Sequence, residues 1–317
     1  MTFVGTVQCI TASIEIKSNR TALKSPTSSV TTMNISAVNP PPQAQALLSS
    51  TQKVSTYETT GGLVTAQFAE HNLSLIPPIQ SGSIIHDNAC GSGTVSRLIL
   101  SSTQPPNSVQ IQATDIDPPF LSALEDAAKE HAWPVSVTNQ RSETLNFPDS
   151  TFTHSLTNIA IFFTSSAGLD GAKEIYRTLQ PGGIAVVNCW AHVTWFVPVR
   201  TVHETIRPGK PFPTPVVAWH DGQQIQKVMQ EAGFKEEDIR AETSDAWAVV
   251  KKEGLREWAE KSWAYLGGIA GWFEDDEKTW DQAVDKLVEL LLVQPGTVVE
   301  GEEVRMKASQ WVLVAKK

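Results

Sequence analysis

The sequence has few of the features that mark secreted, membrane or metal-binding proteins. Its 317 residues include three cysteines, Cys9, Cys90 and Cys189, which lie far apart and match no metal-ligand spacing. We therefore expect no disulfide framework, no metal ion and a reducing, cytoplasmic location. No apolar run approaches the roughly 18 residues of a membrane helix. The N-terminus also lacks the basic segment and apolar core of a secretory signal, so no membrane partner is expected.

Positive charge is also scarce. The chain has 25 Lys and Arg against 34 Asp and Glu, a net charge of −9, and no basic block interrupts the sequence. A nucleic-acid backbone is an unfavourable partner for such a chain, because binding it depends on clustered Lys and Arg. We expect a small-molecule partner, and the sequence gives no indication of an oligomeric state.

The most informative stretch is residues 84–93, Ile-Ile-His-Asp-Asn-Ala-Cys-Gly-Ser-Gly. Two apolar residues end a predicted strand, Asp87 follows, and a turn of small residues leads into a predicted helix at Thr94. Glycine lets the backbone adopt positive φ or approach a ligand closely. This edge of an open α/β sheet is where nucleotides bind. A carboxylate there would repel a pyrophosphate, so Asp87 favours a cationic cofactor.

This stretch resembles motif I of the class I S-adenosylmethionine-dependent methyltransferases, Asp/Glu-x-Gly-x-Gly-x-Gly. Ala89 stands in place of the first glycine, and Gly91 and Gly93 match the other two. Asp115 ends the next predicted strand about 20 residues later, the spacing of an acid that accepts from ribose hydroxyls. Four later segments resemble family motifs in the family's order: 145–152, 177–183, 231–234 and 310–317.

The resemblance implies an α/β fold, a doubly wound and mostly parallel seven-stranded sheet with a helical N-terminal part and lid insertions. Alternating apolar runs and turn signals agree with it. Strands are predicted near 83–87, 109–115, 135–139, 153–157, 184–189, 239–249 and 309–316, the last two as an antiparallel edge. Helices are predicted near 94–101, 119–131, 168–179 and 222–232, with two more between Gln43 and Asn72.

The domain organisation follows from composition. Residues 1–42 are rich in Ser, Thr and Asn and are expected to form a flexible tail. Residues 43–317 are expected to form the methyltransferase domain. Two insertions, 190–221 and 251–295, hold most of the 10 tryptophans. Since tryptophan buries a large area, we expect these insertions to build a substrate lid.

The resemblance also implies a binding site for S-adenosylmethionine. The expected cofactor contacts are Tyr57, Thr65, Asp87, Asn88, Ala89, Cys90, Gly91, Gly93, Asp115, Ile116, Ser142, Glu143 and Asn158. Packing is an equally good interpretation of Tyr57. Many relatives carry an acid after the third strand that binds adenine. Here Arg141 and Ser142 stand at that point, so adenine recognition is expected to use the Ser142 backbone or Glu143.

Methyl transfer from a sulfonium requires alignment and exclusion of water more than acid catalysis. A hydroxyl acceptor often needs a base as well, and His192, just past the fifth strand, is the catalytic candidate. A partly buried structural histidine would look the same in sequence. The expected walls of the substrate pocket are Trp190, Trp195, Trp219 and His220.

The predicted function is S-adenosylmethionine-dependent methyl transfer to an oxygen, nitrogen or sulfur of a small molecule. Tyr57-Glu-Thr-Thr-Gly-Gly62 and Gly271-Trp-Phe-Glu-Asp275 resemble fungal methyltransferases of secondary metabolism. One alternative is a cofactor-binding fold that catalyses cyclisation or rearrangement. Another is a non-catalytic regulatory protein. A NAD(P) dehydrogenase is disfavoured by Asp87.

Overall fold

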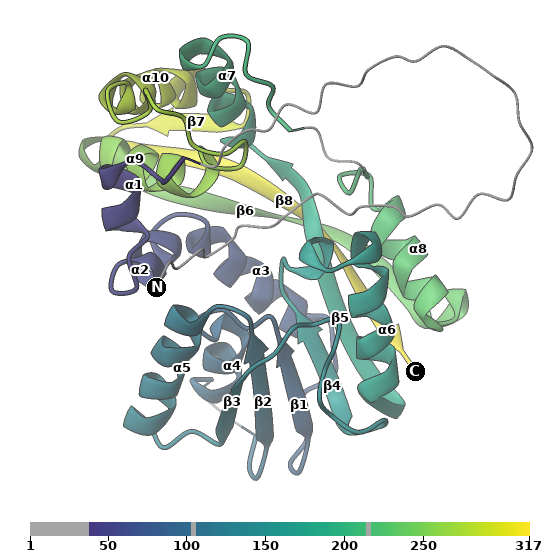
Figure 1. Cartoon of the computed structure of the whole chain (residues 1–317). Helices are drawn as coiled ribbons and strands as arrows, with labels where there is room; N and C mark the ends of the chain where they lie inside the picture. The colour runs from purple at the N-terminus through teal and green to yellow at the C-terminus, as the bar shows by residue number, and fades with distance from the viewer. Residues whose placement is uncertain (1–37, 103–105, 214–216) are drawn as a thin grey trace, which may run out of the picture.

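The computed structural model describes residues 38–102, 106–213 and 217–317 (Figure 1). Its centre is an eight-stranded sheet of order β3-β2-β1-β4-β5-β8-β6, with β7 paired to β8. The strands are β1 (Ile84–Asn88), β2 (Gln110–Asp115), β3 (Val135–Asn139), β4 (Phe152–Thr157), β5 (Leu179–Val193), β6 (Ile239–Lys251), β7 (Thr297–Glu300) and β8 (Glu303–Lys316). β1 to β5 pair in parallel, whereas β8 runs antiparallel to β5, β6 and β7.

Helices cover both faces of the parallel part. α3 (Gly62–Ser74), α4 (Thr94–Leu100) and α5 (Pro118–Glu130) lie on one face, where Ile85, Ile111 and Leu124 are fully buried. α6 (Leu169–Thr178) and α8 (Gln223–Ala232) cover the other, over Val187 and Leu313. The chain order reverses between β1 and β4, so their carboxyl ends form the switch point where doubly wound folds bind ligands.

A second helical layer covers the far ends of the long strands β5, β6 and β8 (Figure 1). It contains α7 (Phe196–Ile206), α9 (Leu255–Leu266) and α10 (Trp280–Val293), which share one apolar cluster with the α3 residues Val64 and Phe68. Two short helices, α1 (Pro42–Leu47) and α2 (Lys53–Glu58), pack against α9. Short 3₁₀ turns occur at Ile161–Phe163, Ser166–Gly168, Glu236–Asp238 and Lys252–Gly254.

The predicted fold class is confirmed, with three differences in detail. The sheet has eight strands because β7 forms a hairpin with β8 through Gly301, whose φ is +54°. β5 is longer than expected and continues to Val193. From residue 38 onward, three helices rather than two precede β1, and the one that starts at Pro42 begins with a favoured first helical residue. Residues 1–37 of the predicted tail lie outside the described residues.

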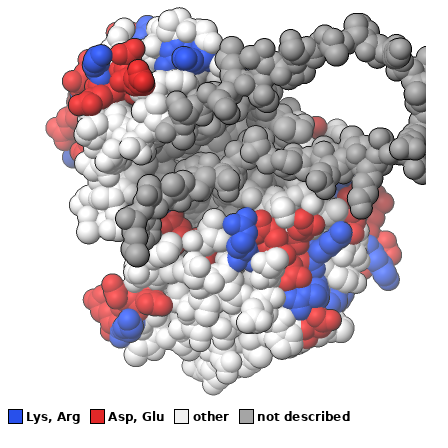
Figure 2. Space-filling model, viewed as in Figure 1, with Lys and Arg blue, Asp and Glu red and all other residues white. Residues whose placement is uncertain are grey.

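Charges of both signs share the surface. Figure 2 shows Lys and Arg atoms beside Asp and Glu atoms on the face it presents, with acids gathered over the end that carries α10. That helix bears Asp281, Asp285 and Glu289, and Arg256 pairs with the first two. Among the residues that the structure describes, no helix is both long enough and apolar enough to cross a membrane.

Candidate functional site

The turn between β1 and α4 has the backbone shape that its glycines suggested. Gly91 has φ +54° and Gly93 has φ +84°. A Cβ on Gly93 would also lie 2.4 Å from Cδ1 of Leu124 in α5. Both the positive φ and this close contact therefore disfavour any residue other than glycine at position 93. Ala89, which stands at the first glycine position, has φ +52°. It therefore holds a left-handed conformation that costs an L-residue about 1–2 kcal/mol.

Asp115 lies directly against this turn. Its Oδ2 accepts the backbone N–H of Gly91 at 2.8 Å, and its Oδ1 accepts the N–H of Asp117 at 2.9 Å. Burial raises the pKa of the Asp115 carboxyl, and these two hydrogen bonds oppose that shift. Ile116 beside it is 59% exposed. The structure thus brings together a glycine turn, a carboxylate and an exposed apolar side chain at the ends of β1 and β2.

Asp87 faces into the protein. It is 1% exposed, and its Oδ2 accepts both the N–H (3.0 Å) and the hydroxyl (2.6 Å) of Ser96. Burial raises the pKa of the Asp87 carboxyl to about 7. Its observed contacts therefore tie β1 to the first turn of α4. Cys90 likewise packs inward, beside Ala113 and Leu121.

Helix α2 lies over the turn. Glu58 accepts a hydrogen bond from the hydroxyl of Ser92 at 2.7 Å, and Lys53 forms an ion pair with Asp117. The Tyr57 hydroxyl lies 3.2 Å from Oγ1 of Thr65. Burial raises the pKa of Tyr57, and the nearby Asp115 and Glu58 raise it further. Sequence reasoning missed Glu58 and Lys53, although Glu58 directly follows Tyr57 in a segment that had been singled out.

Amides and hydroxyls connect the ends of β1, β4 and β5. Asn88 donates to Oγ1 of Thr157 at 3.0 Å and accepts from the hydroxyl of Ser142 at 2.8 Å. Asn158 donates to the backbone carbonyl of Thr65 at 3.0 Å and accepts from Asn188 at 2.9 Å. Three expected contacts, Asn88, Ser142 and Asn158, therefore belong to a neutral polar network.

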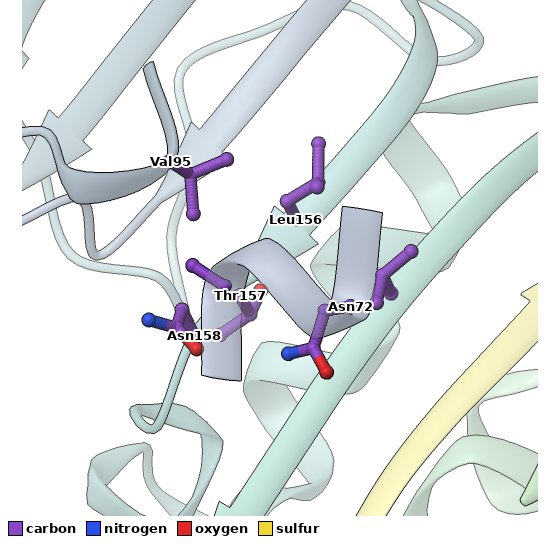
Figure 3. Close-up of a pocket in the computed structure, with 7 residues that line it drawn as sticks. Asn72, Val95, Leu156, Thr157 and Asn158 are labelled. Carbon is purple, nitrogen blue, oxygen red and sulfur yellow. The ribbon is translucent and has the colours of Figure 1, made fainter. Parts of the chain in front are cut away.

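A small cavity lies under this network, between α3, α4, the end of β4 and the middle of β5 (Figure 3). Figure 3 shows Val95 and Leu156 on its apolar side and Asn72, Thr157 and Asn158 along its polar side. Ala69 and Val186 complete its lining. Its volume of about 10 Å³ is close to what one water molecule requires, so it is too small for a substrate.

The expected adenine residue Glu143 stands apart from the glycine turn. Its Oε1 accepts from Arg141 at 3.0 Å and from the backbone N–H of Ser165 at 3.2 Å. One carboxylate oxygen of Glu143 is thus hydrogen-bonded both to the loop after β3 and to the segment that precedes α6. Ser142, the other adenine candidate, is buried through its bond to Asn88.

The predicted substrate-pocket residues divide between the two faces of the sheet. Trp190 packs on Phe68 of α3 with ring centroids 5.7 Å apart, and Trp195 is buried in the same cluster. Trp219 lies instead in the cluster under α6 and α8, and His220, next to it, is exposed. The structure brings Trp190 and Trp195 together and separates them from Trp219 and His220.

His192 also points away from Trp190. Trp190 pairs with Gln310 and His192 pairs with Ser309, with a register shift between them. Gln310 and Ser309 are neighbours in β8 and therefore face opposite sides of the sheet. The register shift thus places their partners Trp190 and His192 on opposite faces of β5. His192 is exposed, and its Nε2 lies 3.3 Å from Oγ1 of Thr194. None of its observed partners is an expected cofactor residue, so the base role stays a prediction without a supporting contact.

The two tryptophan-rich insertions form one layer. Arg207 and Asp276, one from each insertion, make a bidentate ion pair with both N–O distances at 2.8 Å. Their side chains are 2% and 3% exposed. The guanidinium also donates to the carbonyl of Gly267 at 2.7 Å and lies 5.0 Å from the ring centroid of Trp263. A buried, fully paired charge holds 190–221 and 251–295 together.

The electrostatics at the turn favour a cation. The carboxylates of Glu58 and Asp115 contact the turn, and their hydrogen-bond donors are a hydroxyl and backbone N–H groups. Asp87 lies buried behind the turn and is bonded to Ser96. Two cations lie nearby: Arg97 donates to the backbone carbonyl of Ser92 at 2.8 Å, and Lys53 is engaged by Asp117. Within residues 38–102, 106–213 and 217–317, no three His, Cys, Asp or Glu side chains are arranged to hold a metal ion.

Comparisons with known proteins agree with this architecture. Residues 85–183 match the family model described as "Methyltransferase domain". A bis-thiomethyltransferase for acetylaranotin from Aspergillus terreus is 28% identical over 158 residues, 48% of this chain and 53% of that protein. The methyltransferase tpcH from Aspergillus fumigatus is 26% identical over 170 residues, 51% of this chain and 56% of that protein. The aligned part thus spans about half of each relative.

Among solved structures, the [4+2]-cyclase SpnF superposes with a TM-score of 0.50 at 17% identity. The superposition covers 89% of this chain and 99% of that one. A likeness at this identity concerns the fold, which is shared by proteins of different activity.

Proposed function

Because residues 85–183 belong to the methyltransferase domain family and the chain has the class I methyltransferase fold, we propose that it transfers a methyl group from S-adenosylmethionine to a small molecule. The observation that carries the proposal is the contact between Gly91 and Asp115, beside the switch point of the sheet. It combines a close-approach glycine with a carboxylate at the ends of β1 and β2.

The residues at the turn fit this cofactor. A Cβ on Gly91 would meet only Cδ1 of Phe120, at 4.0 Å, so the backbone there is open to a ligand. Asp115 uses one N–H donor on each oxygen, and each oxygen keeps a lone pair for a ribose hydroxyl. Ile116 would cover one face of the adenine. Glu58 and Asp115 would offset the positive charge of the sulfonium and ammonium groups.

When bound, S-adenosylmethionine supplies a methyl group on a sulfonium, whose departure leaves a neutral thioether. The chain must then align the acceptor with the methyl and exclude water. In our proposal Tyr57 and Thr65, joined by their hydroxyls, close the cofactor site on the α2 side. Asn158 fixes the end of β4 against α3 through the carbonyl of Thr65.

A sulfur or nitrogen acceptor suits the groups at this site. The side chains that meet at the ends of β1, β2 and β4 are carboxylates, amides and hydroxyls. A thiolate or a neutral amine is nucleophilic without a strong base, whereas a phenol or alcohol needs one. The printed name of one relative, a bis-thiomethyltransferase, supports sulfur as the first acceptor to test. The fungal origin of that relative supports a role of this chain in secondary metabolism.

The test is incubation of the purified chain with methyl-labelled S-adenosylmethionine and a panel of thiols, amines and phenols. The expected result is S-adenosylhomocysteine together with a labelled product. Conversion of an acceptor without S-adenosylhomocysteine would instead indicate cyclisation or rearrangement, with the cofactor acting by its charge. Cofactor binding without any conversion would favour a regulatory protein.

A further inference from the structure

Two polar atoms of α9 are buried without a partner. Nε1 of Trp258 and Oγ of Ser262 are inaccessible to solvent and have no hydrogen-bond partner among the described residues. Both residues are 3% exposed. Buried polar groups are almost always paired, so each exception calls for a physical reason, such as a water molecule or ligand.

These two atoms share one face of α9 with Tyr265. Positions 262 and 265 follow position 258 by four and seven residues, a spacing that places all three in one row along a helix. The Tyr265 ring packs edge-on against Tyr57, with centroids 6.0 Å apart, and Tyr57 contacts Thr65 of the proposed cofactor site. At 1.5 Å per residue, the row extends about 10 Å from that site.

The surroundings of this row are aromatic. Trp195 packs edge-on against Trp258 with centroids 5.5 Å apart. Phe68, Trp190 and Trp195 belong to the same apolar cluster. A ligand that reaches this row would therefore meet flat apolar surfaces, a hydroxyl and an indole N–H. The indole can only donate a hydrogen bond, so the ligand must supply an acceptor atom.

We propose that Trp258 and Ser262 bind a carbonyl oxygen of the acceptor substrate, which is a flat and mainly apolar molecule lying along the inner face of α9. A carbonyl oxygen has two lone pairs and can accept from both groups. The proposal rests on the proposed function, because it identifies the class of molecule that receives the methyl group. It assigns Trp258 and Ser262 as specificity-determining residues.

The test compares two probes of almost the same shape, 9-fluorenone and fluorene, of which only the first has a carbonyl. Their binding to the full chain, saturated with S-adenosylhomocysteine, is measured by equilibrium dialysis. The wild type is expected to prefer fluorenone by about tenfold or more, the effect of two neutral hydrogen bonds. Trp258→Phe and Ser262→Ala should each reduce that preference at least threefold, and Ser262→Ala should leave fluorene binding unchanged.

Trp280→Phe is the matched control. The indole N–H of Trp280 is already paired, since it donates to Oε1 of Glu260 at 2.9 Å. This variant should keep the preference for fluorenone and lose thermal stability. Ser262→Ala should retain or gain stability in the free protein, because it removes an unpaired buried hydroxyl. A fall in stability of Ser262→Ala would show that the hydroxyl has a structural partner and would overturn the proposal.

Three binding results would also overturn it: a wild type that binds neither probe, equal affinity for the two probes, or an unchanged preference in both variants. These outcomes concern binding alone. Failure of the proposed function appears separately, as the absence of S-adenosylhomocysteine when S-adenosylmethionine and acceptors are supplied to the wild type.

Discussion

Gly91 donates its backbone N–H to Oδ2 of Asp115 across 2.8 Å, which joins the turn after β1 to the end of β2. The two residues are far apart in sequence and meet because β1 and β2 pair in parallel register, Asp87 opposite Ala113 and Asn88 opposite Thr114. The same carboxylate is proposed to bind the ribose, so one residue would both hold the turn and contact the cofactor.

Asp115→Ala is therefore expected to weaken binding of S-adenosylhomocysteine by tenfold to a hundredfold, since charge-assisted hydrogen bonds contribute about 1.5–3 kcal/mol. Calorimetry measures this affinity, and thermal unfolding verifies that the variant is folded. Asp126→Ala, at an exposed position of the adjacent helix α5, is the control and should bind as the wild type does. Unchanged affinity in a folded Asp115→Ala variant would move the ribose site elsewhere.

The turn itself predicts opposite effects for two substitutions. Ala89→Gly should stabilise the protein by up to about 1 kcal/mol, because glycine tolerates the left-handed conformation that alanine holds at φ +52°. Gly93→Ala should destabilise it by more than about 2 kcal/mol, since a left-handed alanine would also clash with Leu124.

Urea unfolding measures both effects. Gly82→Ala supplies the control: its φ is +81°, but a Cβ there would meet nothing within 4 Å. The Gly82→Ala variant should lose only the unfolding free energy that the left-handed backbone costs an alanine, about 1 kcal/mol. Equal losses for Gly82→Ala and Gly93→Ala would mean that Leu124 moves aside without cost.

The raised pKa of the Asp87 carboxyl implies that the stability of the protein depends on pH. Burial raises the pKa of its carboxyl to about 7 in the folded protein, against about 3.9 in the unfolded chain. At pH values between these two pKa values, the Asp87 carboxyl is therefore protonated in the folded state and ionised in the unfolded state. The stabilisation from this group is complete below about pH 4 and disappears as the pH rises through 7.

Asp87→Asn removes that titration. Between pH 5 and pH 7.5, the wild type should lose on the order of 2 kcal/mol more unfolding free energy than the variant. Urea unfolding at the two pH values measures the difference, and Asp126→Asn controls for general charge effects. Parallel pH profiles for wild type and Asp87→Asn would contradict a raised pKa.

The pair of Arg207 and Asp276 should be essential to the helical layer that contains α7, α9 and α10. Arg207→Met leaves a buried carboxylate without its partner, which is expected to cost about 3–5 kcal/mol of unfolding free energy. Arg200→Met, on the helix α7 that ends just before Arg207, removes an exposed pair with Glu204 and should cost less than about 0.5 kcal/mol. Similar melting temperatures for the two variants would show that the insertions hold together without this ion pair.

His192→Ala tests the base predicted from sequence. Loss of a general base would lower kcat by about 10²–10⁴-fold on a hydroxyl acceptor. The structure places His192 on the face of β5 opposite Trp190, so we expect less than a twofold change in kcat and in cofactor affinity. Trp190→Ala, on the other face, should affect turnover more strongly. A kcat loss of a hundredfold or more in His192→Ala would support the base role instead.

Much of the fold could be predicted from local pattern. The strand at 84–88 begins with a short apolar run, and those at 110–115 and 135–139 alternate apolar and polar residues; their observed limits differ from prediction by at most one residue. β7 was missed because four residues in a hairpin give no periodic signal. The position of Asp115 beside the turn followed from spacing, since parallel strands end at the same edge of a sheet.

The fold class, the glycine turn at 89–93 and the acid that accompanies it can be derived from the sequence, because they depend on local backbone freedom and on strand ends. The directions of the side chains depend instead on how distant segments pack together. A register shift between Trp190 and His192 sends them to opposite faces. Asp87 turns toward Ser96 because α4 offers two donors there. Arg207 finds Asp276 through packing of distant helices, a contact between segments that no local pattern encodes.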